Sequence, residues 1–237
     1  METITKGLLI VIDGTDATGK KTQTDLLVAR LSDAGYKVAV ADFPQYGEKS
    51  AGLVEEYLSA KYGDAKEVGP YRASIFYAVD RYAASFKIRQ WLDEGTVVVS
   101  NRYVAANMGH QGGKITDNEE REKYFAWLYD LEYGIFGIPK PDINIILHAD
   151  PLTTQKMVDL KGHRDYIGGT KRDLHEADAQ HLIDASNVYL QLLAQFPDFE
   201  LIDCTSPIDG QMLSREVISE RVWDKVMLKL SAVCVGA

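Results

Sequence analysis

The chain has 237 residues, of which 46% are hydrophobic and 26% charged. This length and composition suit one α/β domain with a sizeable core, so we expect a single domain over residues 1–237. The net charge of −9 argues against duplex nucleic acid or an anionic membrane surface as the main partner, because both need a broad basic face. Two cysteines are too few for a disulfide framework, and neither a basic signal segment nor an apolar run of ~20 residues is present, so we expect a cytoplasmic location.

The first predicted element is a strand that leads into a phosphate-binding loop. An apolar run at 7–13 is typical of a buried parallel strand, and Gly-x-x-x-x-Gly-Lys follows it before a helix expected over 20–34. In such loops the backbone N–H groups point at polyphosphate and the lysine reaches the β- and γ-phosphate oxygens. The pattern therefore predicts that ATP binds to Gly14, Thr15, Asp16, Ala17, Thr18, Gly19, Lys20, Lys21 and Thr22. A purely structural glycine-rich turn is the alternative.

The remaining predicted elements alternate along the chain. Strands are expected at 37–43, 96–100, 143–148 and 199–203, and helices at 50–60, 71–94, 118–136, 151–160, 174–196 and 214–233. The Gly-, Asn- and His-rich residues 101–118 suggest a functional loop or a broken helix end. This alternation predicts an α/β fold with a five-stranded parallel sheet and helices on both faces. The carboxyl ends of the strands should meet in one crevice, where ligands bind.

A set of motifs stands at those strand and helix ends. They are Asp13-Gly-Thr-Asp16 with the phosphate loop, Phe43-Pro-Gln-Tyr46-Gly47, Phe76-Tyr77-Ala-Val-Asp-Arg81, Asn101-Arg102-Tyr103, Pro139-Lys-Pro-Asp142 and the basic segment from Lys161 to Arg172. In this order they resemble the thymidylate kinase family of P-loop nucleoside-monophosphate kinases, which transfer the γ-phosphoryl group of ATP to dTMP. The resemblance covers about residues 8–203. It implies a P-loop NTPase fold with a basic lid at 161–173, ATP and dTMP as ligands, and Mg²⁺ as cofactor.

The resemblance implies a nucleobase site on the helix at 71–94. Tyr77 and Arg81 lie one helical turn apart, so they can present an aromatic ring and a bidentate donor on one face. By resemblance, Tyr77 stacks on the thymine ring and Arg81 contacts a base carbonyl or the acceptor phosphate. The alternatives are that Tyr77 is a core aromatic and that Arg81 pairs with Asp80 or another acid. Phe76 points to the other side of the helix and is expected in the core.

Further acceptor-binding residues follow from the same resemblance. Phe43 and Tyr46 are assigned to the substrate site, although Phe43 suits the core equally well. Asn107 falls where many family members read the pyrimidine edge, and Gln111 could help it. His110 and Gln111 could instead be ordinary loop residues.

Charged residues complete the site that the resemblance implies. Asp16 corresponds to the residue that accepts a hydrogen bond from the sugar 3′-hydroxyl, with a loop-capping turn as the alternative. Asp13 corresponds to an acidic residue near the metal, which it would contact through water. Arg102 corresponds to the arginine that holds the acceptor phosphate, for which a guanidinium fork is well suited.

The lid is expected to supply one more cation. Phosphoryl transfer spreads negative charge over the equatorial oxygens, which a basic lid can neutralise. In family members without an arginine in the phosphate loop, the lid provides one, and here Arg164 or Arg172 is the candidate. The predicted catalytic set is therefore Lys20, Arg102, Arg164 and Arg172. A solvated charged face is the alternative for the lid.

Three positions depart from the family pattern. Lys21 replaces the Ser or Thr that ligates Mg²⁺, Asn101 replaces the usual Asp, and Gln45 stands where an arginine often contacts the acceptor phosphate. The first two changes make the metal position less negative, so weaker Mg²⁺ binding is expected. An active dTMP kinase is the favoured interpretation. A nucleotide-binding protein with weak or no turnover, and a kinase for another nucleotide, remain open.

The resemblance also predicts an oligomer. Members of the family are usually homodimers through helices that include the segment at 71–94. Phe86 and Trp91 are candidates for that interface, although either residue suits the core equally well.

Overall fold

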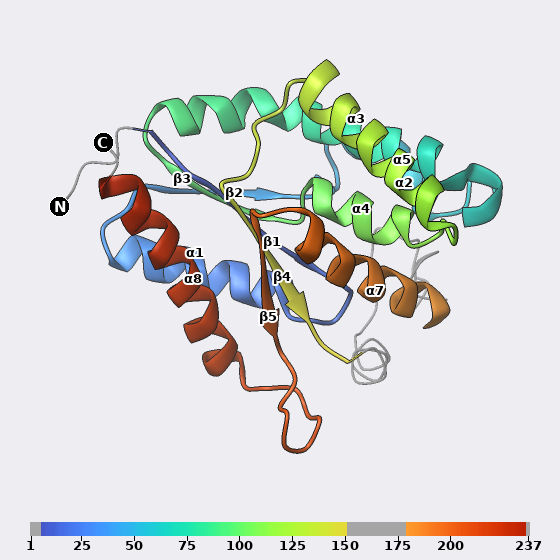
Figure 1. The fold of residues 1–237 in the computed structure, drawn as a ribbon. Helices are drawn as coiled ribbons and strands as arrows, with labels where there is room; N and C mark the ends of the chain where they lie inside the picture. Colours follow the sequence, from blue (N-terminus) through green and yellow to red (C-terminus); the bar gives the residue numbers. More distant parts are fainter. Residues whose placement is uncertain (1–5, 151–178, 236–237) are drawn as a thin grey trace.

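The computed structural model describes residues 6–150 and 179–235, and its centre is a five-stranded sheet in the order β2-β3-β1-β4-β5 (Figure 1). Its strands are β1 (Leu9–Gly14), β2 (Val38–Asp42), β3 (Val97–Asn101), β4 (Ile143–His148) and β5 (Phe199–Asp203). Every strand runs parallel to its neighbours. The predicted parallel sheet is therefore confirmed, with strand bounds that differ by one or two residues at most.

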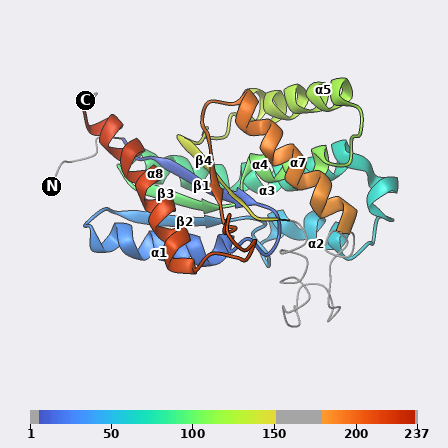
Figure 2. The same cartoon turned by 60° about the horizontal axis from the view of Figure 1, so that its bottom comes forward.

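Helices cover both faces of this sheet, as Figures 1 and 2 show. On one face lie α1 (Lys20–Asp33) and α8 (Arg215–Val235), and on the other lie α3 (Ala65–Asp93), α4 (Val104–Gly112), α5 (Asn118–Tyr129) and α7 (Ala179–Gln195). Along β1, Leu9 and Val11 belong to the second face, whereas Ile10 and Ile12 belong to the first. Because both faces are covered, β1 is apolar from Leu9 to Ile12. No helix in the described ranges is long and apolar enough to cross a membrane.

The helix predicted at 71–94 is the longer part of α3. Asp64 caps α3: its carboxylate accepts the Lys66 and Glu67 N–H groups at 2.8 and 2.9 Å, and the Glu67 carboxylate accepts the Asp64 N–H. Gly69 then leaves helical geometry (φ 74°) just before Pro70. The chain therefore changes direction at Gly69, and the long helix begins at Pro70. Proline is tolerated in the first turn of a helix but disrupts its interior. Beside it packs α2 (Gly52–Leu58), which follows a 3₁₀ turn at Lys49–Ala51.

Residues 101–118, expected to be a functional loop or a broken helix end, contain a helix instead of a continuous loop, because α4 spans Val104–Gly112. This helix lies between α3, α5 and α7, and every one of its residues except Ala106 is buried. A Cβ atom on Gly109 would lie 2.5 Å from the Tyr189 ring, and one on Gly112 would lie 2.8 Å from the Phe125 ring. These glycines allow α4 to pack closely against the neighbouring helices. The high glycine content of this segment therefore reflects helix packing rather than a loop.

Other differences are smaller. The helix predicted at 118–136 consists of α5, capped by the Asp117 carboxylate, and a π-helical turn at Asp130–Ile135. The predicted helix at 151–160, the lid at 161–173 and the first residues of the helix at 174–196 lie outside the described residues.

Candidate active site

The loop between β1 and α1 wraps around the Lys20 side chain. Its first turn is tight, since a Cβ atom on Gly14 (φ 131°) would lie 2.2 Å from the Leu147 carbonyl oxygen of β4. The Lys20 ammonium donates to the Thr15 carbonyl oxygen at 2.6 Å and lies 3.7 Å from the Asp16 carboxylate. The Thr18 hydroxyl donates to the same Thr15 oxygen at 2.8 Å. The loop thus has the curled geometry that a phosphate cradle requires.

A cavity of about 560 Å³ opens at the carboxyl ends of β1, β2 and β3. The loop contributes Asp16, Ala17, Gly19, Lys20, Lys21 and Thr22 to its lining. The rest of the lining consists of Asp42, Phe43, Pro44, Tyr46, Leu58, Tyr77, Arg81, Asn101, Arg102, Ala106, Asn107, His110 and Gln111. The structure therefore brings most predicted loop residues together with every residue predicted for substrate binding. Arg164 and Arg172 lie outside the described residues.

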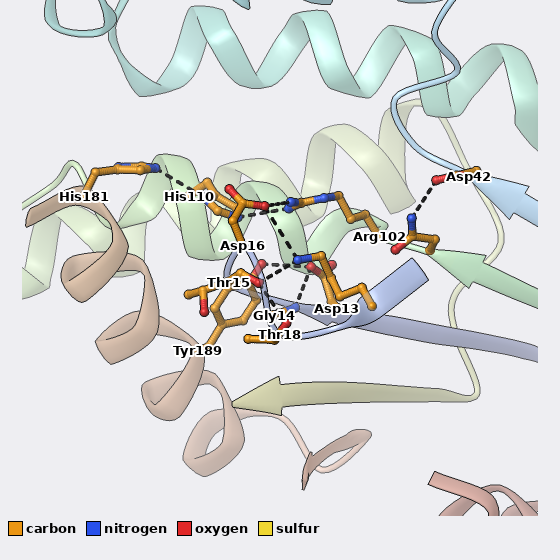
Figure 3. A network of polar contacts seen from close by, with 12 residues as sticks. Asp13, Gly14, Thr15, Asp16, Thr18, Asp42, Arg102, His110, His181 and Tyr189 are labelled. Atoms are coloured by element: carbon orange, nitrogen blue, oxygen red, sulfur yellow. Dashed lines mark hydrogen bonds and ion pairs between the residues drawn. The ribbon is translucent and has the colours of Figure 1, made fainter. Parts of the chain in front are cut away.

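Arg102 lines this cavity and contacts polar groups of the phosphate loop and of α4 (Figure 3). Its guanidinium forms an ion pair with the Asp16 carboxylate, and its NH1 group lies 3.0 Å from His110 Nε2. Its backbone N–H donates to the Ile12 carbonyl oxygen at 2.9 Å, and its φ of 65° is left-handed, a conformation that costs a non-glycine residue about 1–2 kcal/mol. Burial alone would lower the pKa of Arg102, but nearby acids, Asp16 foremost, raise it. Arg102 therefore stays cationic and is held in place from several sides.

His110 links Arg102 to α7. Its Nδ1 atom lies 3.3 Å from His181 Nε2, and burial together with the neighbouring Arg102 lowers the pKa of His110 well below its usual value. A neutral His110 can accept from Arg102 through Nε2 and donate to His181 through Nδ1. Both histidines are nearly buried, at 7% exposure. His110, which the sequence left as a possible loop residue, thus lines the cavity on α4.

Asp13, which the sequence predicts near the metal, is not among the residues that line the cavity. Its carboxylate is fully buried and accepts hydrogen bonds from the Gly14 N–H at 2.9 Å, the Tyr103 N–H at 3.3 Å and the Tyr189 hydroxyl at 2.9 Å. Burial raises the pKa of Asp13, although Arg102 and Lys20 oppose the change. Asp13 instead ties together the ends of β1 and β3 and helix α7.

Asp42 is the cavity carboxylate that the sequence analysis missed. It accepts a hydrogen bond from Asn101 Nδ2 at 2.8 Å, and Asn101 Oδ1 is buried without a hydrogen-bond partner among the described residues. Burial raises the pKa of Asp42, against the lowering effects of Asn101 and Lys21. Asp42 is the last residue of β2, and Arg102 directly follows β3. Its position at a strand end was therefore the sequence feature that could have identified Asp42 as a cavity residue. These two oxygens, from Asp42 and Asn101, are of the kind that Mg²⁺ prefers.

Arg81 makes the ion pair that was the alternative interpretation, with an acid other than Asp80. Its Nε donates to Glu132 at 3.0 Å, its NH2 group makes a closer contact with the same oxygen, and its NH1 group donates to the Tyr103 carbonyl oxygen at 3.3 Å. Burial alone would lower the pKa of Arg81, but Glu132 reverses the effect and raises it. Arg81 is also among the residues that line the cavity, and Glu132 and the Tyr103 carbonyl oxygen fix its guanidinium.

The aromatic residues divide between cavity and core. Tyr77 is partly buried, lines the cavity and meets the Tyr57 ring edge-on at 6.4 Å between centroids. Phe43 does both, since it is 4% exposed in the core and also lines the cavity, whereas Tyr46 is 40% exposed. Phe76 packs against the α2–α3 core, as expected.

Gln45 has a structural role rather than a phosphate-facing one. Its backbone N–H donates to Asp80 Oδ2 at 2.8 Å, and its side-chain Nε2 donates to Asp80 Oδ1 at 2.9 Å. These contacts fasten the segment after β2 to α3. Gln45 is not among the residues that line the cavity.

Comparison with known proteins gives consistent results. A family model described as thymidylate kinase matches residues 12–208. The thymidylate kinase of Mycobacterium tuberculosis (strain H37Rv) is 31% identical over 189 residues, which span 79% of this chain and 86% of that protein. The thymidylate kinase of Homo sapiens is 27% identical over 164 residues, or 69% of this chain and 71% of that one. A solved structure of thymidylate kinase from Candida albicans shares the fold, with a TM-score of 0.73 at 20% identity over 97% of this chain and 94% of that chain.

Proposed function

The chain belongs to the thymidylate kinase family and is an ATP-dependent phosphotransferase, and we propose that the cavity at the ends of β1, β2 and β3 transfers the γ-phosphoryl group of ATP to dTMP. An oxygen of the dTMP phosphate attacks the γ-phosphorus, the bond to the β–γ bridging oxygen breaks, and dTDP and ADP result. The observation that carries the proposal is the single cavity that joins Lys20 and Arg102 to Tyr77 and Asn107.

The residues divide into two groups in this proposal. Lys20 and the loop N–H groups hold the ATP phosphates, and Arg102 neutralises the acceptor phosphate. Tyr77 stacks on the base, Asn107 reads its edge, and Asp16 accepts from the sugar hydroxyl while it orients Arg102. A general base is not required, because the second pKa of a phosphate monoester is about 6 and the acceptor is largely dianionic at neutral pH.

We propose Asp42 and Asn101, which line the cavity, as the residues that would hold Mg²⁺. Asn101 Oδ1 is a buried acceptor with no partner among the described residues, and Asp42 stands beside it. Mg²⁺ commonly binds through one or two carboxylates together with phosphate oxygens and water. When bound, it would neutralise charge on the ATP phosphates. The exposed Lys21 ammonium pairs with Asp25 at 2.5 Å along α1.

The proposal also covers the whole chain and its setting. It treats residues 1–237 as one kinase domain in the cytoplasm, with 161–173 as the lid and Arg164 or Arg172 as its catalytic cation. Support comes from the family match, which spans residues 12–208, and from the single sheet to which all five described strands belong.

An acceptor panel tests the function. We expect ADP release with dTMP, slower release with dUMP, and little with dCMP, AMP or GMP. ATP binding without turnover on any acceptor would support the alternative of a non-catalytic nucleotide-binding protein. Turnover restricted to AMP or GMP would overturn the pyrimidine assignment.

Metal binding provides a second test. The double substitution Lys21→Ser with Asn101→Asp should tighten Mg²⁺ binding to the ADP complex by ~10-fold, because it adds negative charge and a hydroxyl ligand. Asp42→Asn should weaken binding by a similar factor, whereas Asp33→Asn, at the far end of α1, should not change it. Titration calorimetry gives the affinities directly. Equal affinities in all variants would show that neither the charge argument nor the Asp42 assignment is correct.

We further propose a homodimer through α3. Large hydrophobic side chains lie exposed along this helix, namely Tyr71, Ile75, Tyr82 and Phe86, and Phe86 is 58% exposed. A contiguous exposed apolar surface commonly marks an interface. Trp91 instead packs against the core.

The substitution Phe86→Glu should convert the dimer to a monomer in analytical ultracentrifugation, because it places a charge in the proposed apolar interface. Leu228→Glu, at a 70% exposed position on α8, is the matched control and should leave the dimer intact. A wild-type monomer would rule out the interface.

A further inference from the structure

Lys114 is a partly buried lysine two residues after α4 that the proposed chemistry does not use. Its ammonium donates to Gln111 Oε1 at 2.7 Å and to the Tyr57 hydroxyl at 2.8 Å, and it lies 5.5 Å from the centre of the Tyr57 ring. Gln111 lines the cavity and is 1% exposed, whereas Tyr57 meets Tyr77 edge-on. Lys114 thus contacts Gln111 of the proposed base site directly. It reaches Tyr77 of that site through Tyr57.

The contacts of Gln111 and Asn107 fix the orientation of both carboxamides. A protonated lysine has donors only, so the Gln111 amide oxygen must face Lys114 and its NH2 group is left for a ligand. A backbone carbonyl accepts only, so the Asn107 NH2 group faces the Ser74 carbonyl oxygen, at 3.2 Å, and its oxygen is left for a ligand. The cavity lining therefore offers an acceptor from Asn107 and a donor from Gln111, one helical turn apart on α4.

This pair of an acceptor and a donor is complementary to one class of pyrimidine. Thymine and uracil present a ring N3–H beside the O4 carbonyl, which match the Asn107 oxygen and the Gln111 NH2 group. Cytosine presents an N3 lone pair beside an amino group, so both contacts would place like groups together. In a buried site such unmatched groups cost about 1–3 kcal/mol each.

We propose that Lys114 is a positioning residue that holds the Gln111 carboxamide with its NH2 group toward the acceptor base, and thereby makes the cavity select oxo-pyrimidines over amino-pyrimidines. This inference rests on the proposed function, because it requires the acceptor nucleotide to occupy this cavity. Lys114 itself need not touch the nucleotide.

The selection should also depend on pH. Burial lowers the pKa of Lys114 to about 7, and a neutral amine can accept as well as donate, so it no longer fixes the carboxamide. The groups that face the ammonium are the Tyr57 hydroxyl of α2 and Gln111 of α4, and no charged side chain in the described part of the chain contributes to the shift. The preference for dTMP should therefore be largest below pH 7 and fall above it.

The test measures dTMP and dCMP binding to the full chain by titration calorimetry, which needs no turnover. Lys114→Met should reduce the dTMP:dCMP affinity ratio by ~10-fold or more, because the Gln111 amide becomes free to rotate. Lys114→Arg keeps obligate donors, so it should preserve the ratio and remove its fall between pH 6.5 and 8.5. Lys123→Met, at a 58% exposed lysine of α5, is the matched control and should behave as wild type. Thermal unfolding of each variant confirms that it folds.

The possible failures can be told apart. A wild-type chain that does not prefer dTMP to dCMP overturns the proposed function and this inference together. A wild-type preference that persists in folded Lys114→Met overturns the inference alone. If Lys114→Met does not fold, the pH profile of Lys114→Arg decides: a fall in the ratio equal to that of wild type overturns the role of Lys114.

Discussion

The substitution Arg102→Met is expected to lower kcat/KM for dTMP by ~10²–10³-fold, the range found when one preorganised donor to a developing charge is removed. Arg102 lies in the cavity, paired with Asp16 and adjacent to His110, so its guanidinium is positioned before any ligand arrives. Since the Lys20 ammonium and the loop N–H groups remain, ATP binding should change little. Steady-state kinetics with both substrates varied would separate the two effects.

Two further variants sharpen this test. Arg102→Lys keeps the charge but loses the planar fork, so it should restore only part of the activity. Arg30→Met removes an arginine that pairs with Glu220 on the α1–α8 surface, away from the cavity, and is the matched control. An Arg102→Met enzyme within about threefold of wild type would exclude a direct role of this arginine in the transition state.

The substitution Glu132→Gln is expected to lower the free energy of unfolding by about 3–5 kcal/mol, the usual effect of removing one partner of a buried ion pair. Glu132 is fully buried and Arg81 is 1% exposed, so the remaining guanidinium would be left without its counter-charge. Glu132 Oε2 has no hydrogen-bond partner among the described residues, so its other oxygen carries the whole interaction. Urea unfolding followed by circular dichroism measures the change.

A matched double variant separates stability from function. Arg81→Met with Glu132→Leu replaces the pair with apolar side chains and should recover most of the lost stability, because no unpaired charge remains. It should not recover dTMP affinity, because Arg81 lines the cavity. A loss below about 1 kcal/mol in Glu132→Gln would mean that Arg81 finds another partner or water.

The sheet was predictable because its determinants are local in sequence. Alternate residues of β1 contact the two helical layers, so the strand requires an apolar run. Such a run can be recognised from a short stretch of the sequence. The phosphate loop is equally local, since its glycines and Lys20 occupy fixed spacings. The strand ends then indicated that Arg102 would lie in the cavity, whereas Tyr77, on α3, was assigned there from the family resemblance.

What the sequence could not supply is the pairing of distant groups. Glu132 stands in a π-helical turn 51 positions from Arg81, and no spacing rule links them. Asp13 and Asp42 both stand near the carboxyl ends of strands. Only the structure shows that Tyr103 and Tyr189 contact the buried Asp13, whereas Asp42 lines the cavity. Glycines in α4 indicated a loop because their contacts with other helices are not encoded nearby.

The hydrogen bond from the Arg102 N–H to the Ile12 carbonyl oxygen joins the ends of β3 and β1, the strands that lead into the two proposed phosphate contacts, Arg102 and Lys20. Adjacent strands lie about 4.8 Å apart, a spacing that the backbone ladder sets. The separation between the donor and acceptor sites is therefore built into the rigid framework of the sheet. Side-chain substitutions in the cavity can change affinity or charge, but the reach that phosphoryl transfer must span is a property of the main chain.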